Sequence, residues 1–180
     1  DIATQAKKII PGKTVVHIYR DADIWGTYII WSVRVRSSSR GPVSVELNGA
    51  SLESWFYHRI IDLDLTYDDE DQFDIARDIV LNGMIGWSPY GAAANIGLEL
   101  DASLSGVTRD RTYRLSDAAT LGQRLQELAN VENGFEYMIN TFVDLDAEER
   151  RRQFVIETEL GDPDGQLVFT YPGAISSYEI

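Results

Sequence analysis

The chain has 180 residues and carries 29 acidic against 16 basic side chains, a formal net charge of −13. This charge argues against a broad phosphate-binding surface, because duplex binding depends on Lys/Arg clusters that displace counterions, and so against nucleic acid and anionic membranes as partners. Cysteine is absent, which excludes disulfides, thiolate nucleophiles and Cys-ligated zinc. Hydrophobic residues make up 44% of the chain, enough for a packed core, and no apolar run approaches the roughly 18 residues of a membrane span.

The first third of the chain has the period of two that is typical of strands. Apolar residues alternate over 14–20, 25–36 and 43–47, and polar turns separate the three runs. These segments predict a β-meander.

The period changes after Asn48-Gly49. Ser51 is a plausible N-cap for a short helix over 52–59. Acidic residues at 68–71 favour the start of a second helix, which Asn82-Gly83 should end. The segment 83–106 is rich in small residues, and we expect an ordered surface loop there.

The second half of the chain mixes strands with one clear helix. The apolar stripe of Leu121, Leu125 and Leu128 predicts a helix capped by Ser116 and stopped by Asn133-Gly134. Strands are predicted over 109–115, 135–143, 154–158 and 166–170, with a charged turn or helical fragment at 146–152 and a turn at 161–165. On strand 135–143, one side holds Phe135, Tyr137, Ile139 and Thr141. This order of elements indicates an α+β fold whose β layer is interrupted by a helical insertion.

An acidic run is the strongest local feature of the sequence. Eight carboxylates occur within residues 62–78: Asp62, Asp64, Asp68, Asp69, Glu70, Asp71, Asp74 and Asp78. A calcium loop starting at Asp62 would need glycine at its sixth position and an acid at its twelfth, but Tyr67 and Phe73 stand there. We therefore interpret the run as solvated carboxylates at a helix start and predict no metal site and no cofactor.

Catalytic motifs are missing from the sequence. His17 and His58 are too far apart for a helical pair, and no nucleophile-elbow, zinc-protease or phosphate-loop spacing occurs. Asp162 and Asp164 are explained by a tight turn with Pro163 and Gly165. A pair of carboxylates for glycosidic cleavage depends on spatial separation, which a sequence does not give.

Two aromatic residues fall in a loop rather than in a regular element. Trp87 and Tyr90 belong to the run Gly86-Trp87-Ser88-Pro89-Tyr90. Aromatic side chains on a loop are candidates for contact with a carbohydrate or receptor, although they can also anchor the loop itself.

An ordered series of short motifs resembles the minor tail, or tail-hub, proteins of siphophages infecting actinobacteria, which are themselves similar to the hub of contractile-phage baseplates. The motifs cover most of the chain, and none is specific alone. They are Val16-His17-Ile18-Tyr19-Arg20-Asp21, Ile24-Trp25-Gly26, Val45-Glu46-Leu47-Asn48-Gly49, Tyr57-His58-Arg59, Asp71-Gln72-Phe73-Asp74-Ile75-Ala76-Arg77, Gly106-Val107-Thr108-Arg109-Asp110-Arg111-Thr112-Tyr113, Leu125-Gln126-Glu127-Leu128, Gly134-Phe135-Glu136-Tyr137 and Tyr171-Pro172-Gly173.

The resemblance implies a β-barrel-like lobe formed by 1–67 and 151–180, with an α/β insertion lobe over 68–150. The chain has no initiating Met and still carries apolar residues near Ile180, so we expect a piece of a longer tail-hub protein. The implied role is structural and not enzymatic: a homotrimer in the virion, at the tail tip. Its implied neighbours are the distal tail ring protein, the tape-measure protein and receptor-binding tail proteins, and no membrane.

The net charge suggests a further hypothesis. A tail channel must let DNA pass without binding it, and a negative wall repels phosphate. We expect Asp62, Asp64, Asp68, Asp69, Glu70 and Asp71 to be candidates for such a lumen wall. Two other functions stay open: a carbohydrate- or receptor-binding module that uses Trp87 and Tyr90, and a cell-wall hydrolase that uses a carboxylate pair.

Overall fold

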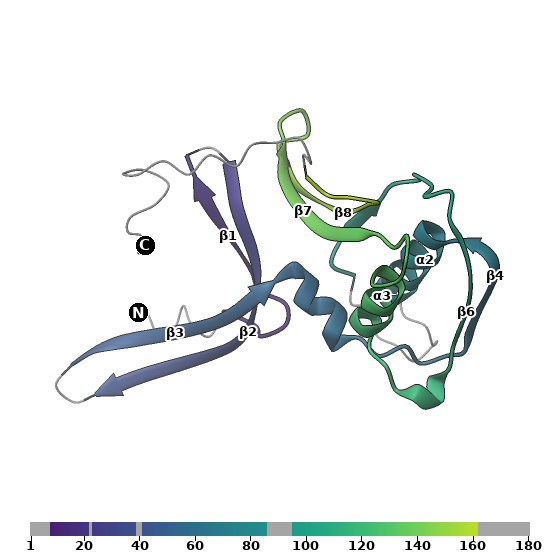
Figure 1. Ribbon diagram of the computed structural model, residues 1–180. Coiled ribbons are helices and arrows are strands. Elements are labelled where there is room, and N and C mark those ends of the chain that lie inside the picture. The colour runs from purple at the N-terminus through teal and green to yellow at the C-terminus, as the bar shows by residue number, and fades with distance from the viewer. Residues whose placement is uncertain (1–7, 22, 39–40, 86–94, 162–180) are drawn as a thin grey trace, which may run out of the picture.

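The computed structural model describes residues 8–21, 23–38, 41–85 and 95–161. Within these residues the chain is a mixed α+β protein, as the sequence predicts, with its strands in three sheets and its helices on one side of the molecule (Figure 1).

The predicted meander is confirmed. β1 (Val15–Arg20), β2 (Asp23–Ser38) and β3 (Gly41–Ser51) form an antiparallel sheet in the order β1-β2-β3. β2 and β3 are longer than the alternation predicts, and together they project beyond β1 as a two-stranded ribbon (Figure 1).

The segment after the meander is a 3-10 helix, η1 (Leu52–His58), and not an α-helix. The Ser51 side chain makes no capping hydrogen bond, so that prediction is wrong. The Ser54 hydroxyl instead donates to the Ser51 carbonyl (2.6 Å) and accepts from the Trp31 ring N–H (2.9 Å). The turn is thus fixed by contacts with β2 rather than by a helix cap.

Helix α2 (Gln72–Ile85) continues past Asn82-Gly83, where the sequence predicts its end. The reason is packing: a Cβ on Gly83 would lie 2.4 Å from Cδ1 of Leu121. The glycine lets α2 approach the next helix closely, and it does not terminate α2.

Helix α3 (Leu121–Ala129) confirms the predicted apolar stripe but not the predicted cap. Ser116 lies in a separate 3-10 turn, η2 (Leu115–Asp117). The cap is Thr120, whose hydroxyl accepts from the Gln123 N–H (3.2 Å) while the Gln123 side chain accepts from the Thr120 N–H (2.7 Å). Asn133 adopts a left-handed conformation, as expected, in the turn that follows the helix.

The remaining strands form two further sheets. β4 (Leu65–Asp71) pairs antiparallel with β6 (Thr108–Tyr113). β8 (Glu149–Glu157) pairs antiparallel with β7 (Glu136–Asp144) and parallel with β5 (Leu98–Leu100), a strand inside the predicted loop 83–106. Residues 149–152 extend β8 towards the N-terminus, so the charged turn predicted at 146–152 ends earlier, at residue 148.

The core joins η1, α2, α3 and the β7–β8 sheet. Its fully buried side chains include Phe56, Phe154, Ile75, Ile79, Leu121, Leu125, Leu128 and Ile156. Of the residues predicted to share one side of strand 135–143, Phe135, just before β7, and Ile139, within it, are buried. The meander contributes Ile29 to this core, and its Val15 and Trp31 pack against the core.

None of the three sheets closes into a barrel within the part of the chain that the structure describes. The predicted boundary at residue 151 falls inside β8, which pairs with β7 along its full length. The division into two lobes stays a prediction. The predicted strand 166–170 and most of the turn 161–165 lie outside the described residues.

The cap of α3 gives a stability prediction. Replacing Thr120 with Ala should lower the free energy of unfolding by about 1 kcal/mol, because the Gln123 backbone N–H loses the hydroxyl that accepts from it. Thr120→Ser is the matched control, since serine keeps the accepting hydroxyl. Chemical denaturation of both variants checks this, and an equal loss in Thr120→Ser would contradict it.

Candidate assembly surface

The β2–β3 ribbon has one polar and one apolar face. Cross-strand register places Val33 opposite Leu47 and Val35 opposite Val45, and residues directly opposite each other share a face. The other face is polar and carries the Arg36–Glu46 ion pair (2.9 Å). The alternation of side chains along each strand, together with the register, therefore produces an apolar stripe, which we define as Val33, Val35, Val45 and Leu47.

No described element of the chain covers this apolar stripe. None of its four residues belongs to the core cluster or packs against it. Val35 is 45% and Leu47 41% exposed, whereas Ile29, at the base of the same sheet, is 1% exposed. A two-stranded ribbon with an uncovered apolar face is marginally stable alone in water. The stripe is thus the surface of the described chain best suited to contact another chain.

The first six carboxylates of the acidic run lie on and before β4, and Asp74 and Asp78 lie on α2. Asp62, Asp64, Asp68, Asp69 and Glu70 are exposed. A helix does begin directly after residues 68–71, as predicted, but these residues themselves belong to a strand with a bulge between Tyr67 and Glu70. Asp69 has a positive φ of 50°, and its N–H donates to Asp110 Oδ1 (2.9 Å). The carboxylate of Asp64 accepts from the Leu115 N–H (2.7 Å).

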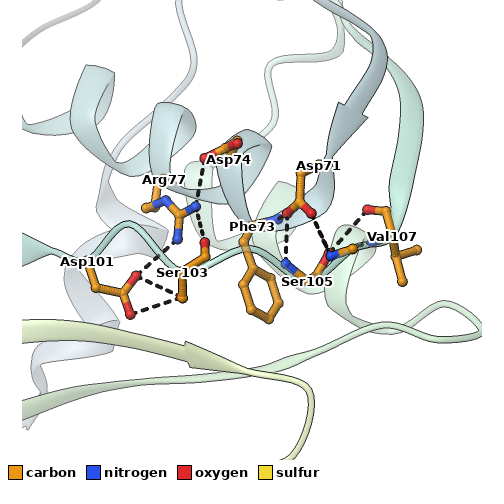
Figure 2. A network of polar contacts seen from close by, with 9 residues as sticks. Asp71, Phe73, Asp74, Arg77, Asp101, Ser103, Ser105 and Val107 are labelled. Carbon is orange, nitrogen blue, oxygen red and sulfur yellow. Dashed lines mark hydrogen bonds and ion pairs between the residues drawn. The ribbon is translucent and has the colours of Figure 1, made fainter.

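Asp71 is the one acid of that set that caps a helix. Its Oδ1 accepts from the Phe73 N–H (2.8 Å), and its Oδ2 accepts from the Gly106 N–H (2.8 Å) and the Ser105 hydroxyl (3.0 Å), as Figure 2 shows in part. Burial raises the pKa of Asp71, but the hydrogen bonds to the carboxylate outweigh it and leave the pKa below its usual value of 3.8. The side chain therefore ties the segment before β6 to the start of α2.

Arg77 completes this network one turn along α2. It is buried, pairs with Asp74 (2.6 Å) and Asp101 (3.0 Å), and donates to the Ser103 carbonyl (Figure 2). Each donor and acceptor here has a structural partner. The arrangement holds residues 101–106 against α2 and leaves no group positioned for chemistry.

The two histidines make separate structural contacts. His17 Nδ1 lies 3.0 Å from the Thr27 hydroxyl on β2, and the His58 ring stacks on Trp31 with 3.7 Å between the centroids. Across residues 8–161 with their gaps, no group of three or more His, Asp or Glu side chains is arranged to hold a metal ion. Trp87, Tyr90, Asp162 and Asp164 lie outside the described residues.

The chain matches no family model, no curated protein and no solved structure. Among the helices that the structure describes, none has the length and apolar character needed to cross a bilayer.

In the sequence, the residues of the apolar stripe belong to two separate segments, each with its own alternation of apolar and polar residues. Val33 and Val35 were assignable to one face of their strand, and Val43, Val45 and Leu47 to one face of theirs. Whether those faces coincide depends on the hairpin register, and whether they are covered depends on where the core ends. Both are tertiary properties.

Asp71 gives a pH-dependent prediction. At pH 7, Asp71→Asn should lower the free energy of unfolding by about 1–3 kcal/mol, because an amide nitrogen would face backbone donors. Since the folded pKa is depressed, the carboxylate stabilises the fold above about pH 4, and that stability is lost as the pH falls through the folded pKa. Urea denaturation from pH 7 to pH 2.5 should show the difference between the two proteins shrink.

Asp68→Asn is the matched control for this experiment, since Asp68 lies on the same strand with an exposed side chain. An Asp71→Asn effect that is no larger than that of Asp68→Asn, or that stays constant with pH, would contradict the assigned role.

Proposed function

We propose that the chain is a structural subunit of a phage tail tip, a hub or baseplate ring component that surrounds the DNA channel. It acts by binding other protein chains and performs no catalysis of its own. The observation that carries this proposal is the uncovered apolar stripe on the β2–β3 ribbon, together with the ordered tail-hub motifs of the sequence.

The geometry of the ribbon supports an assembly role. Covering the stripe would remove apolar surface from water at about 25 cal/mol per Å², and would also fix an otherwise isolated two-stranded ribbon. A ribbon that extends away from the body of its own chain is well placed to reach a neighbour (Figure 1). In this proposal the neighbour is a second copy within a homotrimer.

The open edges of the meander support a second part of the proposal. β1 and β3 each pair on one side only within the described residues. Unpaired strand edges invite further strands. We propose that the meander contributes to a barrel-like lobe in the assembly, completed by residues after 161, by the rest of a longer tail-hub protein or by neighbouring copies.

The exposed acids before and along β4 support the location at the channel. Carboxylates at Asp62, Asp64, Asp68, Asp69 and Glu70 are solvent-facing, and Asp71 lies at the end of the same strand. A wall with this charge would repel DNA phosphates during passage. The remaining proposed partners, at the virion tail tip, are the distal ring protein, the tape-measure protein and receptor-binding tail proteins.

Self-association through the ribbon can be tested directly. Val35→Lys and Leu47→Lys should each lower the association constant at least tenfold, because a charge on the stripe must be desolvated in the interface. Sedimentation analysis over a range of concentrations measures this. Ser44→Lys, on the polar face of the same ribbon, is the control and should associate like the unmodified chain.

Two results would contradict assembly through the ribbon. One is an unmodified chain that is strictly monomeric, and the other is a Ser44→Lys variant whose association is weakened as much as that of the stripe variants. Circular dichroism of each variant should remain unchanged, since the stripe contributes nothing to the described core.

The channel location has its own test. In a cryo-electron microscopy map of the assembled particle, the segment from Asp62 to Asp71 should face the lumen. Gold-labelled antibody against the chain should mark the tail tip of intact particles. A map with this segment on the outer surface would end the lumen hypothesis and leave the ribbon-mediated assembly untouched.

The two other functions raised by the sequence stay predictions. A glycan array that loses binding on Trp87→Ala would support the carbohydrate-binding module, and peptidoglycan hydrolysis by the purified chain would support the hydrolase.

A further inference from the structure

The inward face of the β7–β8 sheet changes its chemistry along its length. Ile139 pairs with Phe154, and both are buried in the core. One step further along the same face, Thr141 pairs with Arg152, and beyond them Val143 pairs with Arg150. The face that is apolar over the core therefore becomes cationic at its far end.

This cationic end lies against β1. The Arg150 Nε donates to the Tyr19 hydroxyl (2.6 Å), and its guanidinium lies 5.8 Å from the Tyr19 ring centroid. Burial, together with the charges of Arg150 and Arg152, lowers the pKa of His17, two residues before Tyr19. We define the candidate site as His17 on β1 together with Arg150 and Arg152, which share one face of β8.

The three consecutive arginines of β8 differ in their partners. Arg151, between the other two on the opposite face of β8, pairs with Glu99 (2.5 Å) and Asp144 (2.8 Å). Neither Arg150 nor Arg152 forms an ion pair with any acid in the described ranges, a property that they share with most described arginines, since only Arg36, Arg77, Arg124 and Arg151 form one.

Two buried polar atoms at this site also lack partners. Arg152 donates through Nη1 to the Ile96 carbonyl, but its Nε is buried without a hydrogen-bond partner, and so is Oγ1 of the neighbouring Thr141. Burial lowers the pKa of Arg152, which reflects the cost of an uncompensated charge. A negatively charged acceptor would give both buried atoms a hydrogen-bond partner and would offset the charge of Arg152.

We propose that His17, Arg150 and Arg152 bind an oxyanion, the phosphate or carboxylate group of a ligand or of another chain. Guanidinium groups match such anions with paired N–H donors. Thr27, which contacts His17, and Thr141, which pairs with Arg152, line a hollow of about 200 Å³. None of the three basic side chains lines this hollow, but its two threonine hydroxyls are donors for a small anion next to them. Glu53 also lines this hollow, and its Oε1 accepts from the Ile139 N–H (2.8 Å). This site stands independently of the proposed tail-tip role.

The test measures thermal unfolding of the whole chain in sodium phosphate, sodium acetate and sodium chloride at matched ionic strength and pH 7. With a Kd of about 1 mM, 10 mM anion should raise Tm by about 3–6 °C above the chloride value. Arg150→Gln and Arg152→Gln should abolish this rise. Arg34→Gln, an exposed arginine on β2, is the matched control and should keep it.

A second measurement covers the case in which Arg152→Gln loses stability. NMR titration of the His17 ring in the unmodified chain should give a higher pKa with anion present, because a bound anion offsets the charges of Arg150 and Arg152. A rise with phosphate alone identifies a phosphate ligand, and an equal rise with acetate identifies a carboxylate. No rise with either anion, or a full Tm rise in Arg150→Gln, would overturn the proposal.

Discussion

The packing of Phe56 is the constraint on which the rest of the structure depends. This residue lies in η1, directly after the meander, and is fully buried. Its ring meets Phe154 edge to face at 5.8 Å and lies 6.3 Å from Tyr137, so one side chain joins η1 to both long strands of the β7–β8 sheet. Aromatic contacts of this kind add to the large area that each ring buries. Ile29 in the same core, the Trp31–His58 stack and the Arg150–Tyr19 contact attach the meander to the α/β part together with this point.

Both proposed surfaces follow from where the meander meets this core. Beyond Trp31 the ribbon leaves the core, so its apolar stripe is uncovered for a geometric reason and not through a lack of apolar residues. On the other side of the attachment, the β1–β2 hairpin lies against the end of β7–β8 where Arg150 and Arg152 replace apolar residues. The junction between meander and sheet is therefore held by polar contacts, and an anion bound there would strengthen it.

The sequence predicted elements better than it predicted their ends and neighbours. Period-two alternation identified β1, β2, β3 and β7 because those strands have one buried face. Asn82-Gly83 and Ser116 were misleading, since Gly83 is required by the approach of Leu121 and the cap is supplied by Thr120. The acids at 68–71 do precede a helix, and Asp71 caps it, but the same residues also end a strand whose partner, β6, is some 40 residues away in sequence. Local chemistry could not show either long-range pairing.

The net charge of −13 and an anion site are compatible because electrostatics in water is local. At physiological ionic strength the Debye length is about 8 Å, so the exposed acids along β4 are largely screened from a group further away than that. Arg152 is instead partly buried, and Arg150 contacts the ring and the hydroxyl of Tyr19, so their charges act at short range on a group bound beside them. Composition therefore argues against a broad phosphate-binding surface but does not exclude a single oxyanion.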